Sequence, residues 1–128
     1  QPAAAALPTP PPVPYPTDTQ AVHHEVELGL ALAAGGQNLS PEAGLAAIFG
    51  YGVGIDLTKR DRQAALKDKG HPWERAKAFD ASAPVSALHP VAAIGHPSAG
   101  AISLSVDGQA RQSGDLSDMI WCLTSSPS

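Results

Sequence analysis

The sequence predicts an α+β domain that is mainly β, with short helices between its strands. Two apolar runs, at residues 21–34 and 53–57, are typical of strands, and residues 101–112 have the alternation of a β-hairpin. Ser40 and Thr58 each stand at the start of a short segment with helix-start signals. With 128 residues, the chain has the size of one domain.

The first sixteen residues differ in composition from the rest of the chain. They hold seven of the thirteen prolines, together with an alanine tract at residues 3–6. Because proline fixes φ and removes a backbone donor, this segment should form neither a helix nor a paired strand along its length. We therefore predict an extended or disordered arm over residues 1–16. It has no basic or continuous apolar region of the kind that a signal peptide needs.

Charge and cysteine content limit the classes of partner. The formal net charge of −4 argues against nonspecific binding to nucleic acid or to an anionic membrane. No apolar stretch approaches the roughly 20 residues that cross a bilayer. The one cysteine, Cys122, excludes an internal disulfide and suits a reducing compartment, so we expect a cytoplasmic protein. We expect Cys122 to be a buried small hydrophobic residue.

The first strand and the first helix follow the arm. The apolar run at residues 21–34 predicts a strand, which a Gly-Gly pair ends. Ser40 as N-cap and Pro41 in the first turn then predict a helix through Phe49. Gly50 ends this helix and leads into the second strand.

The second strand, at residues 53–57, leads into a second helix that ends near Lys69. Thr58 and Asp61 have the spacing of a capping box, and Gly70 closes the helix. The helix carries five of the eight basic residues: Lys59, Arg60, Arg62, Lys67 and Lys69. We expect most of them on a solvated face, with anion binding as the alternative, favoured at the helix N-terminus.

The C-terminal part predicts a hairpin. Residues 101–106 alternate between apolar and polar side chains, and Asp107-Gly108 supplies a two-residue type I′ turn into residues 109–112. The preceding stretch, residues 84–100, is rich in proline and glycine. It predicts an ordered surface excursion rather than a separate element.

Three carboxylates on the two apolar runs predict a metal site. Glu25 and Glu27 are one residue apart, so on a strand they leave the same face roughly 6.5–7 Å apart, and Asp56 lies in the second run. Acidic residues are rarely buried unless they are paired or bound to a metal ion. The competing interpretation places Glu25 and Glu27 on the solvated face of an amphipathic strand.

The ligand types indicate which ion would bind. Carboxylates alone select a hard cation, so Mg²⁺, Mn²⁺ or Ca²⁺ would fit. Zinc is the weaker alternative, because it would recruit neighbouring imidazoles such as His23 and His24. Two acids side by side on one strand cannot flank a sugar ring, which excludes a glycosidase.

Four ordered blocks of the sequence resemble the fumarylacetoacetate hydrolase family: residues 23–29, residues 54–61, residues 72–80, and residues 107–109 continuing to 120–121. The resemblance covers roughly residues 14–121 and is greatest to the bacterial acylpyruvate or fumarylpyruvate hydrolases. It implies a mixed β-roll or barrel-like sandwich, here incomplete. The implied organisation is a partial family domain over residues 17–121 and a divergent tail at 122–128.

The resemblance also implies roles for single residues. It assigns the binding of Mg²⁺ or Mn²⁺ to Glu25, Glu27 and Asp56. It matches Lys77 to a lysine that binds the substrate and polarises its oxo or enolate oxygen, which makes Lys77 the expected catalytic residue. Arg60 and Gln63 match positions near the substrate. Without the resemblance, Lys77 would be interpreted as a surface lysine.

The implied activity is metal-dependent hydrolysis of a carbon–carbon bond in a small 2,4-dioxo acid. The substrate would be an acylpyruvate such as fumarylpyruvate, cleaved to release pyruvate in aromatic catabolism. Oxaloacetate decarboxylation and keto–enol isomerisation are alternatives at the same site. A further alternative is a truncated family member that binds a metal ion or a partner protein without catalysing a reaction. The resemblance further implies a homodimer, which would cover exposed sheet edges.

Two family segments have no counterpart in this sequence. One carries a histidine and a glutamate that activate the hydrolytic water, and the other is a glycine-rich loop that follows the position of Trp121. We therefore expect a chain that is truncated or remodelled at both ends. His23 and His24 are expected to be structural groups rather than a replacement base.

Overall fold

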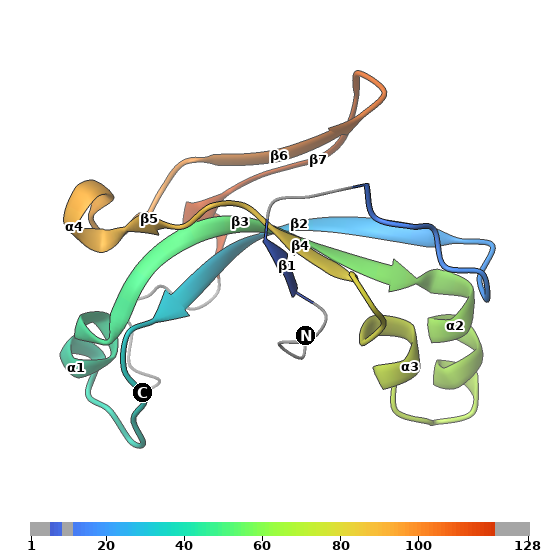
Figure 1. The fold of residues 1–128 in the computed structure, drawn as a ribbon, viewed down its shortest axis with the longest axis horizontal. Coiled ribbons are helices and arrows are strands. Elements are labelled where there is room, and N and C mark those ends of the chain that lie inside the picture. Colours follow the sequence, from blue (N-terminus) through green and yellow to red (C-terminus); the bar gives the residue numbers. More distant parts are fainter. Residues whose placement is uncertain (1–5, 9–11, 120–128) are drawn as a thin grey trace. The chain divides into compact units, whose positions relative to one another are not determined.

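The computed structural model describes residues 6–8 and 12–119 (Figure 1). This part of the chain is mainly β with a few short helices, as the sequence predicts. Its strands are β1 (Ala6–Pro8), β2 (Val22–Leu32), β3 (Ile48–Lys59), β4 (Ala83–Val85), β5 (His89–Pro90), β6 (Ala101–Val106) and β7 (Gln109–Asp115). Its helices are α1 (Pro41–Ala46), α2 (Arg60–Asp68), α3 (Glu74–Lys77), α4 (Val91–Ile94) and a 3₁₀ turn at Leu116–Asp118. The predicted tail at 122–128, with Cys122, lies outside the described residues.

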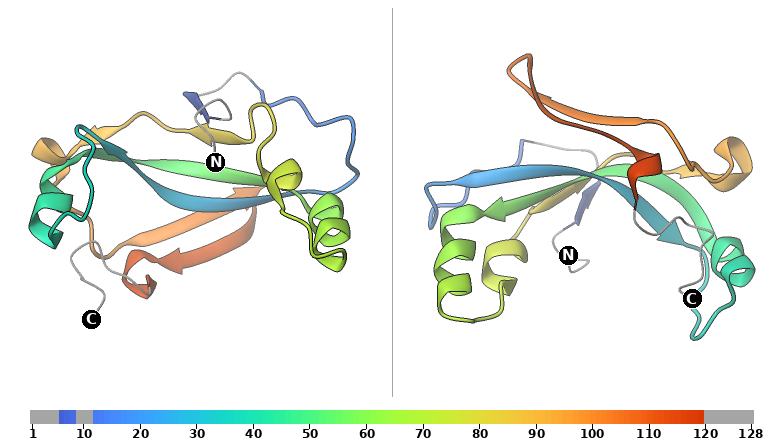
Figure 2. Two further views of the ribbon diagram at one scale, coloured as in Figure 1. Left: turned by 90° about the horizontal axis from the view of Figure 1, so that it is seen from below. Right: turned by 180° about the vertical axis from the view of Figure 1, so that it is seen from behind.

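The strands form two sheets. The larger sheet has the order β1-β4-β3-β2, with β5 also paired to β3, and β6 pairs with β7 in a two-stranded ribbon (Figure 2). In the larger sheet β1 runs parallel to β4, whereas β4 and β5 run antiparallel to β3. Neither sheet closes into a barrel within the described residues.

The chain divides into two compact units. The first unit contains the residues up to 27 together with residues 53–87, and the second contains residues 28–52 and those from 88 onward. The first half of β2 and most of β3 therefore belong to the first unit, with α2, α3 and β4. All six predicted site residues lie in this unit.

The first helix begins where the sequence predicts and ends earlier. The Ser40 hydroxyl accepts a hydrogen bond from the backbone N–H of Ala43 at 3.2 Å, and Pro41 is the first helical residue. The helix ends at Ala46, not at the predicted Phe49, because the chain is already part of β3 from Ile48.

The capping box predicted for the second helix is wrong. β3 continues to Lys59, so Thr58 is a fully buried strand residue whose hydroxyl has no hydrogen-bond partner among the described residues. The Asp61 carboxylate instead accepts hydrogen bonds from the Thr19 hydroxyl at 2.5 Å and from the backbone N–H of Gln20 at 3.1 Å. Asp61 thus fastens the segment before β2 to the start of α2.

The predicted hairpin is present. Asp107 and Gly108 both have positive φ, 51° and 75°, as a type I′ turn requires. The hairpin continues beyond the predicted end, because β7 runs to Asp115. The prediction of a surface excursion without elements at residues 84–100 is wrong, since this stretch contains most of β4 and all of β5 and α4.

The N-terminal arm contains one strand that the sequence does not predict. Ala6–Pro8 pairs in parallel with Ala83–Val85, which differs from the expectation of no paired strand over residues 1–16. The domain boundaries at 16 and 121 stay predictions. Within the described part of the chain, no helix is long and apolar enough to span a membrane.

Gly50 offers a test of the packing in the second unit. It pairs with Pro90 of β5, and a Cβ at Gly50 would lie 2.5 Å from the backbone oxygen of His89. Because the strand backbone cannot move aside without disturbing this pairing, Gly50→Ala should lower the free energy of unfolding by about 1–3 kcal/mol. Urea denaturation followed by circular dichroism measures the change.

Gly44 provides the matched control. It lies in α1, and a Cβ there would meet nothing within 4 Å. Gly44→Ala should leave stability unchanged or raise it by up to about 1 kcal/mol, because alanine favours the helix. If Gly44→Ala lowered the free energy of unfolding as much as Gly50→Ala does, the close approach of β5 to β3 would be contradicted.

Candidate metal centre

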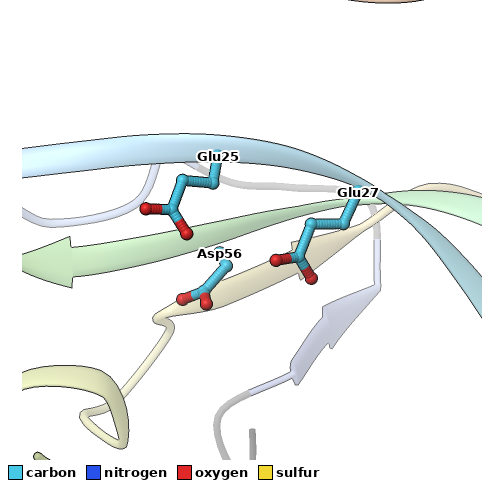
Figure 3. A group of neighbouring side chains, drawn as sticks. All are labelled: Glu25, Glu27 and Asp56. Carbon is cyan, nitrogen blue, oxygen red and sulfur yellow. The ribbon is translucent and has the colours of Figure 1, made fainter. Parts of the chain in front are cut away.

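The three predicted carboxylates converge in the first unit. β2 places Glu25 and Glu27 on one face, with Val26 buried on the other, and β3 supplies Asp56. One carboxylate oxygen of each acid lies within 4.8 Å of the others. Figure 3 shows the three side chains directed into the same space. The structure thus brings together the acids that the sequence singles out, which we call the carboxylate cluster.

The cluster fits a single hard cation. Oxygens on opposite sides of one ion can lie up to about 5 Å apart for Ca²⁺ and up to about 4.2 Å apart for Mg²⁺. The oxygens of the cluster all lie within 4.8 Å of one another, which suits Ca²⁺ directly and requires the side chains to draw slightly closer around Mg²⁺. Among the described residues no imidazole joins the cluster, so the donor set consists of oxygen alone. Such a set suits Mg²⁺, Mn²⁺ or Ca²⁺ better than zinc.

Two cationic side chains border the carboxylate cluster. Lys77 ends α3, and its Nζ lies 2.6 Å from Asp56 Oδ2 and 3.2 Å from Glu25 Oε2. Arg60 begins α2, and its Nη2 lies 3.1 Å from Glu25 Oε1. Arg60 Nη1 also donates a hydrogen bond to Gln63 Oε1 at 2.8 Å. The structure therefore gathers all six predicted site residues in one place.

Glu27 is the member of the cluster without a direct partner. Among the described residues it has no hydrogen bond or ion pair, whereas Glu25 and Asp56 both contact Lys77. Burial, followed by the charges of Asp56 and Glu25, raises the pKa of Glu27, and the charge of Lys77 opposes this only in part. A bound divalent cation would supply the missing positive charge.

Lys77 remains protonated at neutral pH. Burial acts against its charged form, but the hydrogen bonds to Asp56 and Glu25 outweigh burial and raise the pKa of Lys77. The side chain is 26% exposed, so it is partly open to a ligand. Lys77 is therefore suited to donate a hydrogen bond to a developing negative charge and is poorly suited to act as a base.

The backbone around Lys77 is held by small buried residues. Ala76 and Ser82 are both fully buried, and the Ser82 hydroxyl donates a hydrogen bond to the backbone oxygen of Lys77 at 2.9 Å. Ser82 thus positions Lys77. Sequence reasoning missed Ser82, because it lies after the family block at residues 72–80 and no local pattern distinguishes it.

Comparison with known proteins decides the family. Residues 1–125 match the model described as the C-terminal part of fumarylacetoacetate (FAA) hydrolase. The chain belongs to the fumarylacetoacetate hydrolase family. The predicted family fold is thereby confirmed, with sheets that are open in the described part.

Relatives within the fumarylacetoacetate hydrolase family include enzymes of two kinds. An oxaloacetate tautomerase of Escherichia coli (strain K12) is 49% identical over 100 residues, covering 77% of this chain and 46% of that protein. A fumarylpyruvate hydrolase of a Ralstonia species is 37% identical over 99 residues, covering 77% of this chain and 51% of that protein.

A solved structure agrees closely with this chain. The crystal structure of fumarylpyruvate hydrolase from Pseudomonas aeruginosa in complex with Mn²⁺ and pyruvate has a TM-score of 0.91 and 41% sequence identity. The match covers 97% of this chain and 55% of that one. This chain spans about half the length of the relatives it matches. The Mn²⁺ in that relative supports a divalent metal ion for the family, while the roles of single residues in this chain stay predictions.

Proposed function

We propose that this chain acts with a divalent metal ion on a small 2-oxo acid by stabilising the enolate of that acid. The observation that carries the proposal is the convergence of Glu25, Glu27 and Asp56 beside the ammonium group of Lys77. The three carboxylates would hold Mg²⁺ or Mn²⁺. When bound, such an ion serves as a Lewis acid toward charge on the oxygens of a 2-oxo acid.

The chain's own cations would complete the substrate site. Lys77 is protonated and would donate a hydrogen bond to the oxygen on which enolate charge develops. Arg60 presents a guanidinium group that suits a planar carboxylate of the substrate. Its hydrogen bond to Gln63 Oε1 at 2.8 Å fixes the orientation of this group.

The first candidate reaction is the interconversion of the keto and enol forms of oxaloacetate. It is favoured by the 49% identity to the E. coli oxaloacetate tautomerase. In this reaction one proton leaves C3 and another is taken up by the oxygen on C2, so the enolate is the species between the two forms. Lys77 would stabilise the charge on the C2 oxygen.

The second candidate is hydrolysis of an acylpyruvate such as fumarylpyruvate. It is favoured by the Ralstonia fumarylpyruvate hydrolase and by the P. aeruginosa relative that holds Mn²⁺ and pyruvate. Water adds to the distal carbonyl, and the bond between that carbon and C3 breaks. The electron pair of this bond remains on pyruvate as its enolate, which then takes up a proton. Both candidates therefore need the same stabilisation.

Two parallel assays separate the candidates. The chain is incubated with Mn²⁺ and either oxaloacetate, whose enol is followed by its ultraviolet absorbance, or fumarylpyruvate, whose product pyruvate is followed with lactate dehydrogenase and NADH. We expect metal-dependent turnover of at least one substrate, abolished by EDTA. Stabilisation by Mn²⁺ without turnover of either substrate would contradict the proposal and favour a metal-binding chain without catalysis.

We further propose that the chain forms a cytoplasmic homodimer. The cytoplasm suits a chain with one cysteine, because thiols stay reduced there. In the second unit, Leu30 and Leu32 of β2 are 47% and 60% exposed, which is apolar surface that a second copy could cover.

A further inference from the structure

The first unit contains a hollow that is lined by none of the six site residues. Its volume is about 480 Å³. Its walls come from α2, from the turn that follows α2, and from α3, which Figure 1 and Figure 2 show side by side. We call it the basic hollow and define it by Asp18, Arg62, Ala65, Leu66, Lys69, His71 and Arg75.

Permanent positive charge dominates the basic hollow. Arg62 and Lys69 approach it from α2 and its C-cap, and Arg75 approaches it from α3. The one acid in its lining, Asp18, lies 2.6 Å from Lys59 Nζ, and this contact holds the pKa of Asp18 below its ordinary value. The charge of Asp18 is therefore already matched by Lys59. Arg62 interacts with the charges of Asp18 and Asp61, whereas Lys69 and Arg75 form no ion pair within the described part of the chain.

Arg62, Lys69 and Arg75 are all exposed, but they come from two helices and not from one helix face. Among the described residues, neither Lys69 nor Arg75 takes part in an ion pair. Arg62 Nε donates a hydrogen bond to the backbone oxygen of Asp18 at 2.7 Å, which holds its guanidinium group at the hollow. Lys67, by contrast, lies on the same helix but does not line the hollow. Like charges gathered at one concave place favour a shared anion.

We propose that the basic hollow binds a small molecule that carries phosphate groups. Its volume lies within the roughly 300–1,000 Å³ range of small-molecule sites. Arg62 and Arg75 can each donate two parallel hydrogen bonds to phosphate oxygens, and Lys69 adds a point charge. Ala65 and Leu66 form an apolar wall against which the organic part of such a molecule can pack.

The position of the hollow gives the bound anion a structural effect. Arg60 begins α2 and Lys77 ends α3, so the helices that line the hollow also carry the two cations of the carboxylate cluster. An anion that bridges Lys69 and Arg75 would hold these two helices together. Because it binds the folded chain alone, it raises the melting temperature of the protein.

Calorimetric titration of the metal-free chain tests the proposal. The probes are inorganic phosphate, pyrophosphate and ATP at low ionic strength, where exposed charges are least screened. We expect saturable binding of pyrophosphate and ATP. The double variant Lys69→Gln, Arg75→Gln should weaken this binding by about tenfold or more, because two charge-assisted contacts are lost.

A second double variant controls for net charge. Lys67→Gln with Arg111→Gln removes the same two charges from exposed positions outside the hollow, and its affinity should match that of the wild type. Tighter binding of ATP than of pyrophosphate would identify an organic phosphate as the ligand, and equal binding would identify the phosphate groups alone. Either result supports the site.

Two results would overturn the proposal. One is the lack of saturable binding by any probe, and the other is an equal loss of affinity in both double variants. If circular dichroism shows that the first double variant is unfolded, Arg75→Lys replaces it and should still weaken pyrophosphate binding, since lysine lacks the paired donors of arginine. Unchanged affinity in Arg75→Lys would then overturn the proposal. Neither metal nor substrate is present, so the result is independent of the proposed function.

Discussion

Replacement of Glu27 by glutamine should lower the affinity of the chain for Mn²⁺ by at least about 100-fold. Even the neighbours of metal ligands contribute about 10–100-fold to affinity, so loss of a ligand should cost at least as much. Glu27 is suited to this test because it has no hydrogen bond or ion pair among the described residues, and its removal breaks no contact with Lys77 or Arg60. Calorimetric titration with Mn²⁺ measures the change.

Glu27→Gln should weaken Mn²⁺ binding without weakening the metal-free fold. Burial and the neighbouring acids raise the pKa of Glu27 above its ordinary value of 4.5. The metal-free folded chain therefore takes up a proton more readily than the unfolded chain, and its stability falls as the pH rises from 4.5 through the raised pKa. Above this window the charge of Glu27 destabilises the fold. Glu27→Gln should thus be as stable as the wild type, or more stable, at pH 7 without metal.

Asp68→Asn is the control for the loss of one negative charge. Asp68 is an exposed acid at the end of α2 and does not belong to the carboxylate cluster. Its replacement should leave Mn²⁺ affinity unchanged. Glu27 is an exposed strand residue, and if Glu27→Gln bound Mn²⁺ as tightly as Asp68→Asn does, Glu27 would not be a ligand.

The carboxylate cluster could be predicted from sequence because strand geometry is local. The spacing of Glu25 and Glu27 fixes that they share a face, and their apolar neighbours indicate that the strand lies in a sheet. Asp56 could be added because it lies on a second apolar run. No long-range information was needed beyond the pairing of two strands.

Lys77 could not be predicted from such patterns. It lies on a helix of four residues, Glu74–Lys77, which is too short to show helical periodicity. Only the family resemblance singled it out. Its position depends on the buried Ala76 and on the hydrogen bond from Ser82, which are tertiary contacts.

The element boundaries failed for a related reason. Thr58 and Asp61 have the spacing of a capping box, but the pairing of β3 extends the strand through Lys59 and buries Thr58. Likewise, Gly50 is typical of a helix end in the sequence, yet it lies within β3 beside β5. In both places long-range strand pairing outweighed a local helix signal.

Replacement of Lys77 by methionine should separate catalysis from metal binding. We expect kcat to fall by about 10²–10³-fold on whichever substrate the chain turns over, because one preorganised donor to the enolate oxygen is lost. Mn²⁺ affinity should stay the same or increase. Lys77 Nζ lies 2.6 Å from Asp56 and 3.2 Å from Glu25, so it competes with a metal ion for the same carboxylates.

The metal-free stability of this variant adds a second readout. Hydrogen bonds to Asp56 and Glu25, which outweigh the opposing effect of burial, raise the pKa of Lys77 above its ordinary value of 10.5. The stability that Lys77 contributes is therefore fully present below pH 10.5 and is lost as the pH rises through the raised pKa. Lys77→Met should be less stable than the wild type at pH 7, and the difference should shrink at strongly alkaline pH.

Lys67→Met is the matched control, since Lys67 is an exposed lysine on α2 outside the carboxylate cluster. It should leave kcat, Mn²⁺ affinity and stability unchanged. A Lys77→Met variant that loses Mn²⁺ binding together with activity would show that Lys77 holds the carboxylates in place rather than stabilising the enolate. If Lys77→Met still binds Mn²⁺ but has lost turnover, Lys77 contacts the reacting oxygen of the substrate. A contact with the substrate lowers kcat and leaves the affinity for Mn²⁺ unchanged.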